Sequence, residues 1–166
     1  MEVLNQAFSR LTEIVFKYNG TLDKFIGDCV MAFYGAPIST GNDALNAVRS
    51  ALEMRAVFNE LKTQWGDDGR SSLGLAIGIN TGEAIVGNIG SDRRMEYTVI
   101  GDTVNVAARL QDKATAGQIL IGEATFAQIQ AEVGDLLVHR LLKDIGLKGR
   151  EQLLAVHEVI RIMTAV

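Results

Sequence analysis

The stretch that decides the fold is IGINTGEAIVGNIGSDRRMEYTVIGDTVNVAARLQ, residues 77–111. The first half of this stretch overlaps two apolar segments, residues 73–79 and 83–89. We expect these segments to be two strands that follow each other directly. The glycines in these segments are too frequent for plain strands, and they indicate bends or the close approach of another backbone. The stretch therefore predicts strands that pack tightly against a neighbouring element.

Helices and hairpins follow one another irregularly on both sides of this stretch. Asp102 or Thr103 is suited to cap a helix over residues 103–114, and Gly20 is suited to the left-handed position after the first helix. The other expected elements are helices over residues 3–18, 42–65 and 122–132, two strands within 21–34 around a turn at Gly27-Asp28, and strands over 118–121, 136–143 and 153–160. This order favours an α+β layer fold over a doubly wound parallel sheet.

The composition is that of one globular domain. The chain has 166 residues, of which 48% are apolar and 22% charged, and this balance excludes a disordered protein. The net charge of −4 excludes a broad basic face, so we expect no nucleic-acid partner. The single cysteine, Cys29, excludes a disulfide framework and fits a reducing compartment. Apolar runs are short and the first residues lack a signal-peptide pattern, so we expect no membrane segment.

Lys24 and Asp28 flank the expected turn in LDKFIGDCVMAFYGAP, residues 22–37. Charged residues at a turn usually only contact water. An aspartate there is also suited to hold Mg²⁺, which takes carboxylate oxygens and keeps several of its waters. Both interpretations of Asp28 stay open from the residues alone.

Asn105 and Arg109 are four residues apart on the expected helix, so they share one face. An amide and a planar guanidinium aimed together suit a phosphate ligand, and they also suit an ordinary polar face. Arg93 and Arg94 lie in a glycine-flanked hairpin, where arginines contact solvent or bind a polyphosphate. The glycines match neither the P-loop nor the dinucleotide-binding spacing, which excludes both of those sites.

Lys148 stands between two glycines and has the same two interpretations, a solvated lysine or a phosphate ligand. His139 and His157 lie on expected strands, with no further histidine at metal-ligand spacing. We interpret both histidines as structural. No hydrolase motif occurs in the chain.

Taken together and in this order, residues 22–37, residues 77–111 and the LKG at 147–149 resemble the catalytic domain of class III adenylate and guanylate cyclases. The resemblance extends over nearly the whole chain. It implies one ferredoxin-like α+β domain over residues 1–166, with an antiparallel sheet flanked by helices. It also implies a head-to-tail homodimer, or a pairing with another cyclase domain, with active sites at the interface.

The resemblance implies conversion of a nucleoside triphosphate to a cyclic nucleotide and pyrophosphate, assisted by two Mg²⁺ or Mn²⁺ ions. Asp28 matches a metal-binding aspartate, and Arg93 matches the arginine that reaches the triphosphate from the same chain. In the partner, Asn105 would orient the ribose and Arg109 would meet the charge that develops on the α-phosphate. Lys148 would hold the terminal phosphates.

Lys24 and Thr98 match the two positions that read the base. Lysine only donates hydrogen bonds, whereas threonine donates and accepts. Lys24 can donate to N1 of adenine, and Thr98 can accept from the exocyclic amine. Guanine readers typically have glutamate at position 24, so we expect ATP as the substrate. Threonine at position 98 is similar to a bacterial subgroup, which includes cyanobacterial enzymes, that often responds to bicarbonate.

One segment of the family pattern, F-x-D-[I/L]-x-G-F-T with the first metal aspartate, is missing from the 23 residues before Lys24. We therefore expect a domain that is incomplete at its N-terminus, weak or inactive, and prone to associate through exposed strands and apolar faces. A non-catalytic nucleotide-binding or dimerisation module is the alternative, and an unrelated α+β binding domain is a third. The resemblance implies that the domain faces the cytosol.

Overall fold

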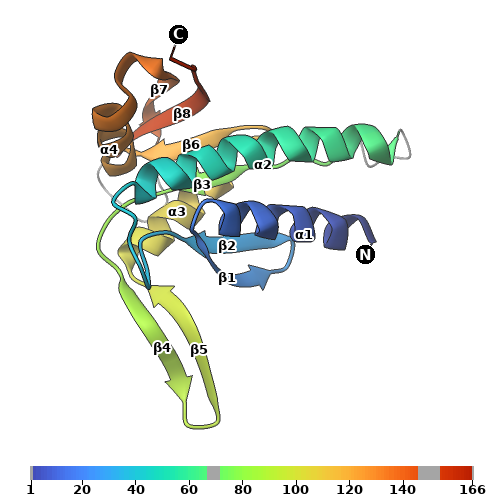
Figure 1. Ribbon diagram of the computed structural model, residues 1–166, viewed down its shortest axis with the longest axis vertical. Coiled ribbons are helices and arrows are strands. Elements are labelled where there is room, and N and C mark those ends of the chain that lie inside the picture. Colours follow the sequence, from blue (N-terminus) through green and yellow to red (C-terminus); the bar gives the residue numbers. More distant parts are fainter. Residues whose placement is uncertain (1, 67–71, 146–153, 166) are drawn as a thin grey trace. The chain divides into compact units, whose positions relative to one another are not determined.

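The computed structural model describes residues 2–66, 72–145 and 154–165. Helices and mainly antiparallel strand pairs make up these residues (Figure 1), which confirms the α+β class. The contacts divide the chain into two compact units: the first holds residues 1–73 and 84–101, and the second holds residues 74–83 and 102–166. Within the described residues, no helix combines the length and the apolar character needed to cross a membrane.

Two helices, α1 (Glu2–Lys17) and α2 (Asp43–Trp65), pack along each other in the first unit (Figure 1). Both bury apolar residues at helical spacing, which drives this packing. Polar contacts join the same two helices. Lys17 and Tyr18 bind the Glu53 carboxylate at 2.8 and 2.7 Å, and they hold the pKa of Glu53 below its ordinary value.

The end of α1 differs from the expectation in one residue. Asn19, not Gly20, takes the left-handed conformation, with φ of 60°. Asparagine tolerates this conformation because its short polar side chain bonds locally. Gly20 has another reason to be glycine, because a Cβ there would lie 2.7 Å from the Tyr34 ring and 2.8 Å from Val15. Close packing, not backbone freedom, requires a glycine at this position.

Two hairpins complete the first unit. Strands β1 (Thr21–Ile26) and β2 (Cys29–Phe33) pair antiparallel around the expected turn at Gly27-Asp28. Gly27 has φ of 61°, the conformation that the first central residue of a tight hairpin turn needs. Strands β4 (Ile85–Ser91) and β5 (Arg94–Ile100) form a longer hairpin, which extends as an arm in Figure 1.

The second unit holds a four-stranded sheet in the order β3-β6-β8-β7. Its elements are β3 (Ile77–Ile79), α3 (Asp102–Lys113), β6 (Ile119–Gly122), α4 (Glu123–Val133), the short helix η2 (Gly134–Leu136), β7 (Leu137–Ile145) and β8 (Leu154–Ile162). The β3–β6 pair is parallel and the other pairs are antiparallel, so this sheet is mixed. Val106 and Leu110 of α3 pack with Leu120 and Val156 of the sheet in a buried cluster.

The expected pair of strands over residues 73–79 and 83–89 is wrong in its extent and pairing. β3 has only three residues and pairs with β6, whereas β4 pairs with β5. The local apolar pattern was correct for a strand, but the pattern carries no information about its partner. The partner of β3 lies far along the chain, where Ile119 faces Ile77.

His139 and His157 lie on the neighbouring strands β7 and β8 and contact each other. Their Nδ1 atoms are 3.2 Å apart, and Nε2 of His157 lies 2.8 Å from the Glu123 carboxylate. The Phe126 ring stacks on His157 with ring centres 3.7 Å apart. Burial, and then the charge of His157, lower the pKa of His139. Among the described residues no group of three or more potential ligands could hold a metal.

Candidate active site

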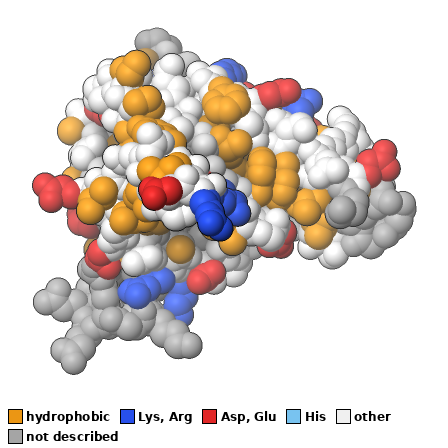
Figure 2. Space-filling model, turned by 90° about the horizontal axis from the view of Figure 1, so that it is seen from below, with side chains coloured by type: hydrophobic (Ala, Val, Ile, Leu, Met, Phe, Trp, Pro, Cys, Tyr) orange, Lys and Arg blue, Asp and Glu red, His pale blue; other side chains and the backbone are white. Residues whose placement is uncertain are grey.

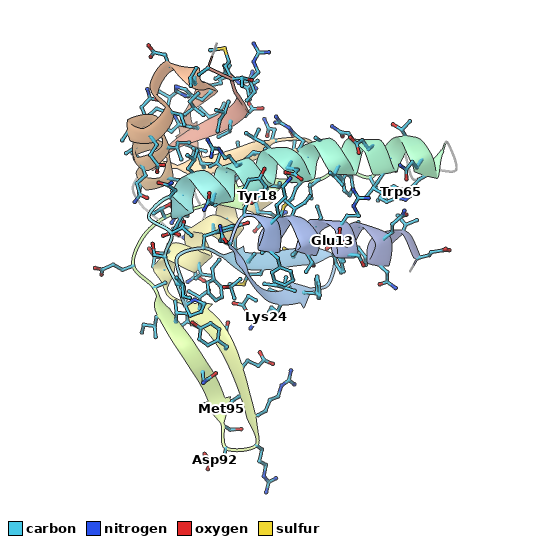
Figure 3. All side chains as sticks on the ribbon, viewed as in Figure 1. Glu13, Tyr18, Lys24, Trp65, Asp92 and Met95 are labelled. Atoms are coloured by element: carbon cyan, nitrogen blue, oxygen red, sulfur yellow. The ribbon has the colours of Figure 1, made fainter. Side chains whose placement is uncertain are left out.

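The two expected base-reading residues meet at one buried carboxylate. Thr98 on β5 is buried, and its hydroxyl donates to the Asp23 carboxylate with oxygen–oxygen distances of 2.7 and 3.0 Å. Nζ of Lys24, the next residue on β1, lies 3.5 Å from the same carboxylate. The Asp23 side chain is completely buried. Lys24 and Thr98 are thus brought together through Asp23, in the region where Figure 3 labels Lys24.

Glu96 holds Lys24 from the other side. Nζ of Lys24 donates to Oε2 of Glu96 at 3.4 Å, while Nε and Nη2 of Arg94 donate to Oε1 at 3.0 and 2.6 Å. The Arg94 guanidinium and the Lys24 ammonium hold the pKa of Glu96 below its ordinary value. The side chain therefore stays charged and keeps the lysine ammonium at this position.

Asp23 and Glu96 belong to this site, although the sequence pattern did not indicate either residue. In a regular strand Asp23 and Lys24 would point to opposite faces. The pairing of β1 with β2 advances by two residues from Leu22 to Lys24, while β2 advances only from Ala32 to Met31. Asp23 is the extra residue of this β-bulge, and bulges redirect side chains. The one available signal was an aspartate directly beside a candidate lysine.

Asp28 lies in the turn between β1 and β2 and is exposed. Mg²⁺ is commonly held by one or two carboxylates together with its waters and the phosphates of a substrate. An exposed carboxylate at a hairpin turn suits that arrangement as a single ligand. The described residues add no cluster that would form a complete protein cage around the ion.

Arg93 lies at the exposed tip of the β4–β5 hairpin, next to Asp92, which Figure 3 labels at the end of the arm. The neighbouring Arg94 has a different role, because its guanidinium is bound to Glu96. The two adjacent arginines are therefore not equivalent. Arg93 extends from a solvent-exposed turn, where it is open to a ligand or to another chain.

Asn105 and Arg109 lie on the same face of α3, which confirms that part of the expectation. Asn105 is exposed and Arg109 is half-buried. The start of the helix is fixed by two bonds: Asn80 Nδ2 donates to the Thr103 carbonyl at 3.2 Å, and the Thr103 hydroxyl donates to the Glu83 carbonyl at 2.7 Å.

Gly78 allows α3 to lie directly against β3. A Cβ at this position would be 2.3 Å from the Gln111 amide nitrogen and 2.4 Å from the Ala107 carbonyl oxygen. Both atoms belong to the helix backbone, so no side chain can rotate out of the way. This confirms the expected close approach, and it sets the depth at which the helix presents Arg109.

The candidate residues are divided between the two units. Lys24, Asp28, Arg93 and Thr98 belong to the first unit, Asn105 and Arg109 belong to the second, and Lys148 lies outside the described residues. Within each unit the residues have the local geometry described above. Their combination in a single site stays a prediction.

The family model of the adenylate and guanylate cyclase catalytic domain matches residues 1–158. The chain belongs to this family. Adenylate cyclase 1 of Rhizobium meliloti (strain 1021) is 33% identical to this cyclase chain over 166 residues, an alignment that covers 99% of the chain and 24% of that protein. The chain thus spans about a quarter of the length of this curated relative. The expectation of one cyclase domain over residues 1–166 stays a prediction.

Two solved cyclases share the fold. The adenylyl cyclase CyaB from P. aeruginosa superimposes with a TM-score of 0.87 and 37% identity, covering 96% of this chain and 81% of that chain. The guanylyl cyclase Cya2 gives a TM-score of 0.85 and 35% identity, covering 97% and 80%. These matches confirm the resemblance to class III cyclases. Because an adenylyl and a guanylyl cyclase are similar to nearly the same degree, the choice of base has to be argued from the residues.

Proposed function

We propose that this cyclase domain converts ATP to cyclic AMP and pyrophosphate. The 3′-oxygen of the ribose attacks the α-phosphorus, the bond from that phosphorus to the bridging oxygen of pyrophosphate breaks, and the hydroxyl proton leaves to solvent. The observation that carries the choice of ATP is the meeting of Lys24 and Thr98 at the Asp23 carboxylate. A donor and a hydroxyl held side by side match the adenine edge.

Adenine presents an acceptor at N1 and a donor at its exocyclic amine. Lys24 has three N–H donors, of which Asp23 and Glu96 face two. The remaining N–H can bind N1, and the Thr98 oxygen can accept from the amine. Guanine presents the opposite pattern at these two positions, with a donor at N1 and an acceptor at O6.

The phosphates would be bound by residues from the two chains of a dimer. Arg109 would stabilise the charge on the α-phosphate in the transition state, since a guanidinium forms paired bonds to phosphate oxygens. Asn105, one turn earlier on the same face of α3, would orient the ribose. Arg93 and Lys148 would hold the triphosphate and its terminal phosphates. Binding in this way places the 3′-oxygen in line with the leaving group.

Asp28 would hold Mg²⁺ or Mn²⁺ together with the triphosphate. The bound ions supply neutralisation of phosphate charge and a lower pKa for the attacking hydroxyl. The contribution of this chain is one carboxylate at the exposed turn of the β1–β2 hairpin. The expectation that the domain is weak or inactive stays a prediction.

A head-to-tail homodimer would complete each site, with Asp28 and Arg93 from one chain and the other residues from its partner. Large apolar side chains are exposed on β1, β4 and β5 of the first unit, which supports such an interface. They are Phe25, Ile26, Ile85, Met95 and Ile100. Figure 2 shows hydrophobic side chains gathered at the surface. We propose that the domain acts on the cytosolic side of the cell.

Mass spectrometry of the cyclic nucleotides tests the proposal. Purified chain is incubated with ATP and Mn²⁺ or Mg²⁺, beside the variant Asp28→Ala. The matched control is Asp135→Ala, an exposed aspartate of η2 in the other unit. We expect slow formation of cyclic AMP by the wild type and by the control, and almost none by Asp28→Ala. Equal product from all three proteins would remove Asp28 from the mechanism.

The second candidate is a non-catalytic nucleotide-binding or dimerisation module. The observation that favours it is Asp28 itself, a carboxylate without a surrounding ligand cluster among the described residues. A module of this kind would bind ATP in equilibrium dialysis and would release no cyclic AMP. Binding together with turnover selects the cyclase.

A further inference from the structure

We infer that Asp23 is a specificity-determining positioning residue, which forces the Thr98 hydroxyl to act only as an acceptor toward the base. The inference rests on the proposed reading of a purine by Lys24 and Thr98. It adds a residue that touches no substrate and acts through its neighbour. Its basis is the geometry of one buried carboxylate.

Within the part of the chain that the structure describes, the polar contacts of Asp23 lead to the base-reading residues or their strand. Its oxygens lie 2.7 and 3.0 Å from the Thr98 hydroxyl, 3.4 Å from the Val99 amide nitrogen and 3.5 Å from Nζ of Lys24. The side chain is fully buried, so water cannot replace these partners. Because a buried carboxylate needs donors, the Thr98 hydroxyl and the Val99 amide both point their hydrogens at it.

A threonine hydroxyl has one hydrogen and two lone pairs. An ionised carboxylate only accepts, so the one hydrogen of Thr98 is committed to Asp23. The lone pairs that remain can only accept from a ligand. A free threonine hydroxyl could bind either base, because it can donate or accept. Bonded to Asp23, the Thr98 hydroxyl can only accept, so it selects a base that presents a donor.

This selectivity distinguishes the two purines at the sixth ring position. Adenine carries an amino donor there, which the Thr98 oxygen can accept, whereas guanine carries the acceptor O6. Guanine would place O6 against the hydroxyl oxygen of Thr98, whose hydrogen is bonded to Asp23. Rotation of the hydroxyl toward O6 would leave a buried Asp23 oxygen without its partner, and such a loss is costly.

The β-bulge in β1 makes the arrangement possible. Asp23 is the extra residue between the Leu22–Ala32 and Lys24–Met31 pairs, so adjacent residues of one strand both reach β5. A regular strand would present Asp23 and Lys24 on opposite faces. The bulge thus brings the ammonium donor and the carboxylate that orients Thr98 to the same place.

A double-variant cycle tests the inference. The proteins are wild type, Asp23→Asn, Thr98→Val and the combination of both, and the readout is the ratio of kcat/KM for ATP to that for GTP. An amide at position 23 can donate to Thr98, which frees the hydroxyl to donate to O6. We expect Asp23→Asn to lower the ratio about tenfold when Thr98 is present, because guanine gains a hydrogen bond from the hydroxyl in place of a contact between two acceptor oxygens.

The same substitution should change the ratio much less in the Thr98→Val background, because no hydroxyl remains to be oriented and only the contact of Asp23 with Lys24 is altered. An equal drop in both backgrounds, or no drop with Thr98 present, would overturn the inference. Circular dichroism of each variant confirms that it is folded. If Asp23→Asn does not fold, NMR of threonine-labelled wild type decides: the Thr98 hydroxyl proton should exchange slowly with solvent, and rapid exchange would contradict its bond to Asp23.

Turnover tests the proposed function, whereas nucleotide binding tests this inference even in a chain without turnover. If the wild type yields no cyclic nucleotide, the cycle is read from dissociation constants, with ATP and GTP competing against a fluorescent ATP analogue. If Asp23→Asn changes the ratio of the two dissociation constants about tenfold only when Thr98 is present, the inference about Asp23 is supported and only the proposed catalysis is excluded. A wild type that binds ATP and GTP equally overturns the inference and leaves the cyclase reaction to be judged by its product.

Discussion

Glu96 on β5 faces Lys24 on β1, with Oε2 and Nζ 3.4 Å apart. The pair holds the lysine ammonium on the face of β5 that also carries Thr98, two residues after Glu96. A substitution at position 24 therefore also removes a partner of the Glu96 carboxylate. Both changes affect which base is bound.

Lys24→Glu should lower the preference for ATP over GTP. The new carboxylate would accept from N1 of guanine, and it would no longer donate to N1 of adenine. We expect kcat/KM for ATP to fall about tenfold or more, as the loss of a charged hydrogen bond implies. The control is Lys113→Glu, the same change of charge at an exposed position of α3. An unaltered base preference would defeat the assignment of Lys24.

Glu96→Gln added to Lys24→Glu should raise GTP turnover above that of the single variant. Two carboxylates at this distance repel each other, and an amide at position 96 removes the repulsion. The measurement is cyclic GMP formation by both variants under the same conditions. Equal rates would show that Glu96 does not act on position 24.

Arg109→Ala should reduce kcat by about two to three orders of magnitude, with a much smaller change in KM, because its proposed contact strengthens in the transition state. Arg161→Ala, which removes an exposed arginine of β8, serves as the matched control. Steady-state kinetics with ATP separate the two constants. A normal kcat in the Arg109 variant would exclude this residue from the mechanism.

Gly78→Ala should destabilise the protein and reduce activity together. The added methyl group would meet the backbone of α3, so the helix has to move, at a cost of about 1–3 kcal/mol. Urea unfolding measures the loss. Gly87→Ala is the control, since a Cβ at Gly87 meets nothing within 4 Å. Equal stabilities of the two variants would contradict the close packing of α3 on β3.

Stability should fall as the pH falls below about 6.5, the ordinary pKa of histidine. Burial and the charge of His157 lower the pKa of His139 in the folded chain. Between the lowered pKa and about 6.5 the unfolded chain binds more protons, so the free energy of unfolding rises with pH across that window. We expect a smaller pH dependence in His139→Gln, measured by urea unfolding at about pH 7.5 and about pH 5. An identical slope in both proteins would exclude His139 as a cause.

Most elements of the fold follow from local patterns. The apolar periodicity of residues 42–65 and 103–114 predicted α2 and α3, and the turn at Gly27-Asp28 predicted the β1–β2 hairpin. These features depend on residues that are neighbours in the sequence. The pairing of β3 with β6 depends on residues far apart in the sequence, and β3 is shorter than its apolar pattern predicted.

The site shows the same division between local and distant contacts. Lys24 and Thr98 could be identified from a resemblance in sequence, but the carboxylate that joins them could not. Asp23 reaches Thr98 only because a bulge interrupts the alternation of β1, and β1 contains no glycine that would have indicated a bulge. Contacts between residues 23 and 98 depend on the folded arrangement of two hairpins.

The most direct test of the account is a competition between the two substrates. The chain is incubated with equal concentrations of ATP and GTP and with Mn²⁺, and both cyclic products are measured by mass spectrometry. We expect cyclic AMP as the main product of the wild type and a shift toward cyclic GMP in Asp23→Asn. Cyclic GMP as the main product of the wild type would contradict the reading of adenine by Lys24 and Thr98.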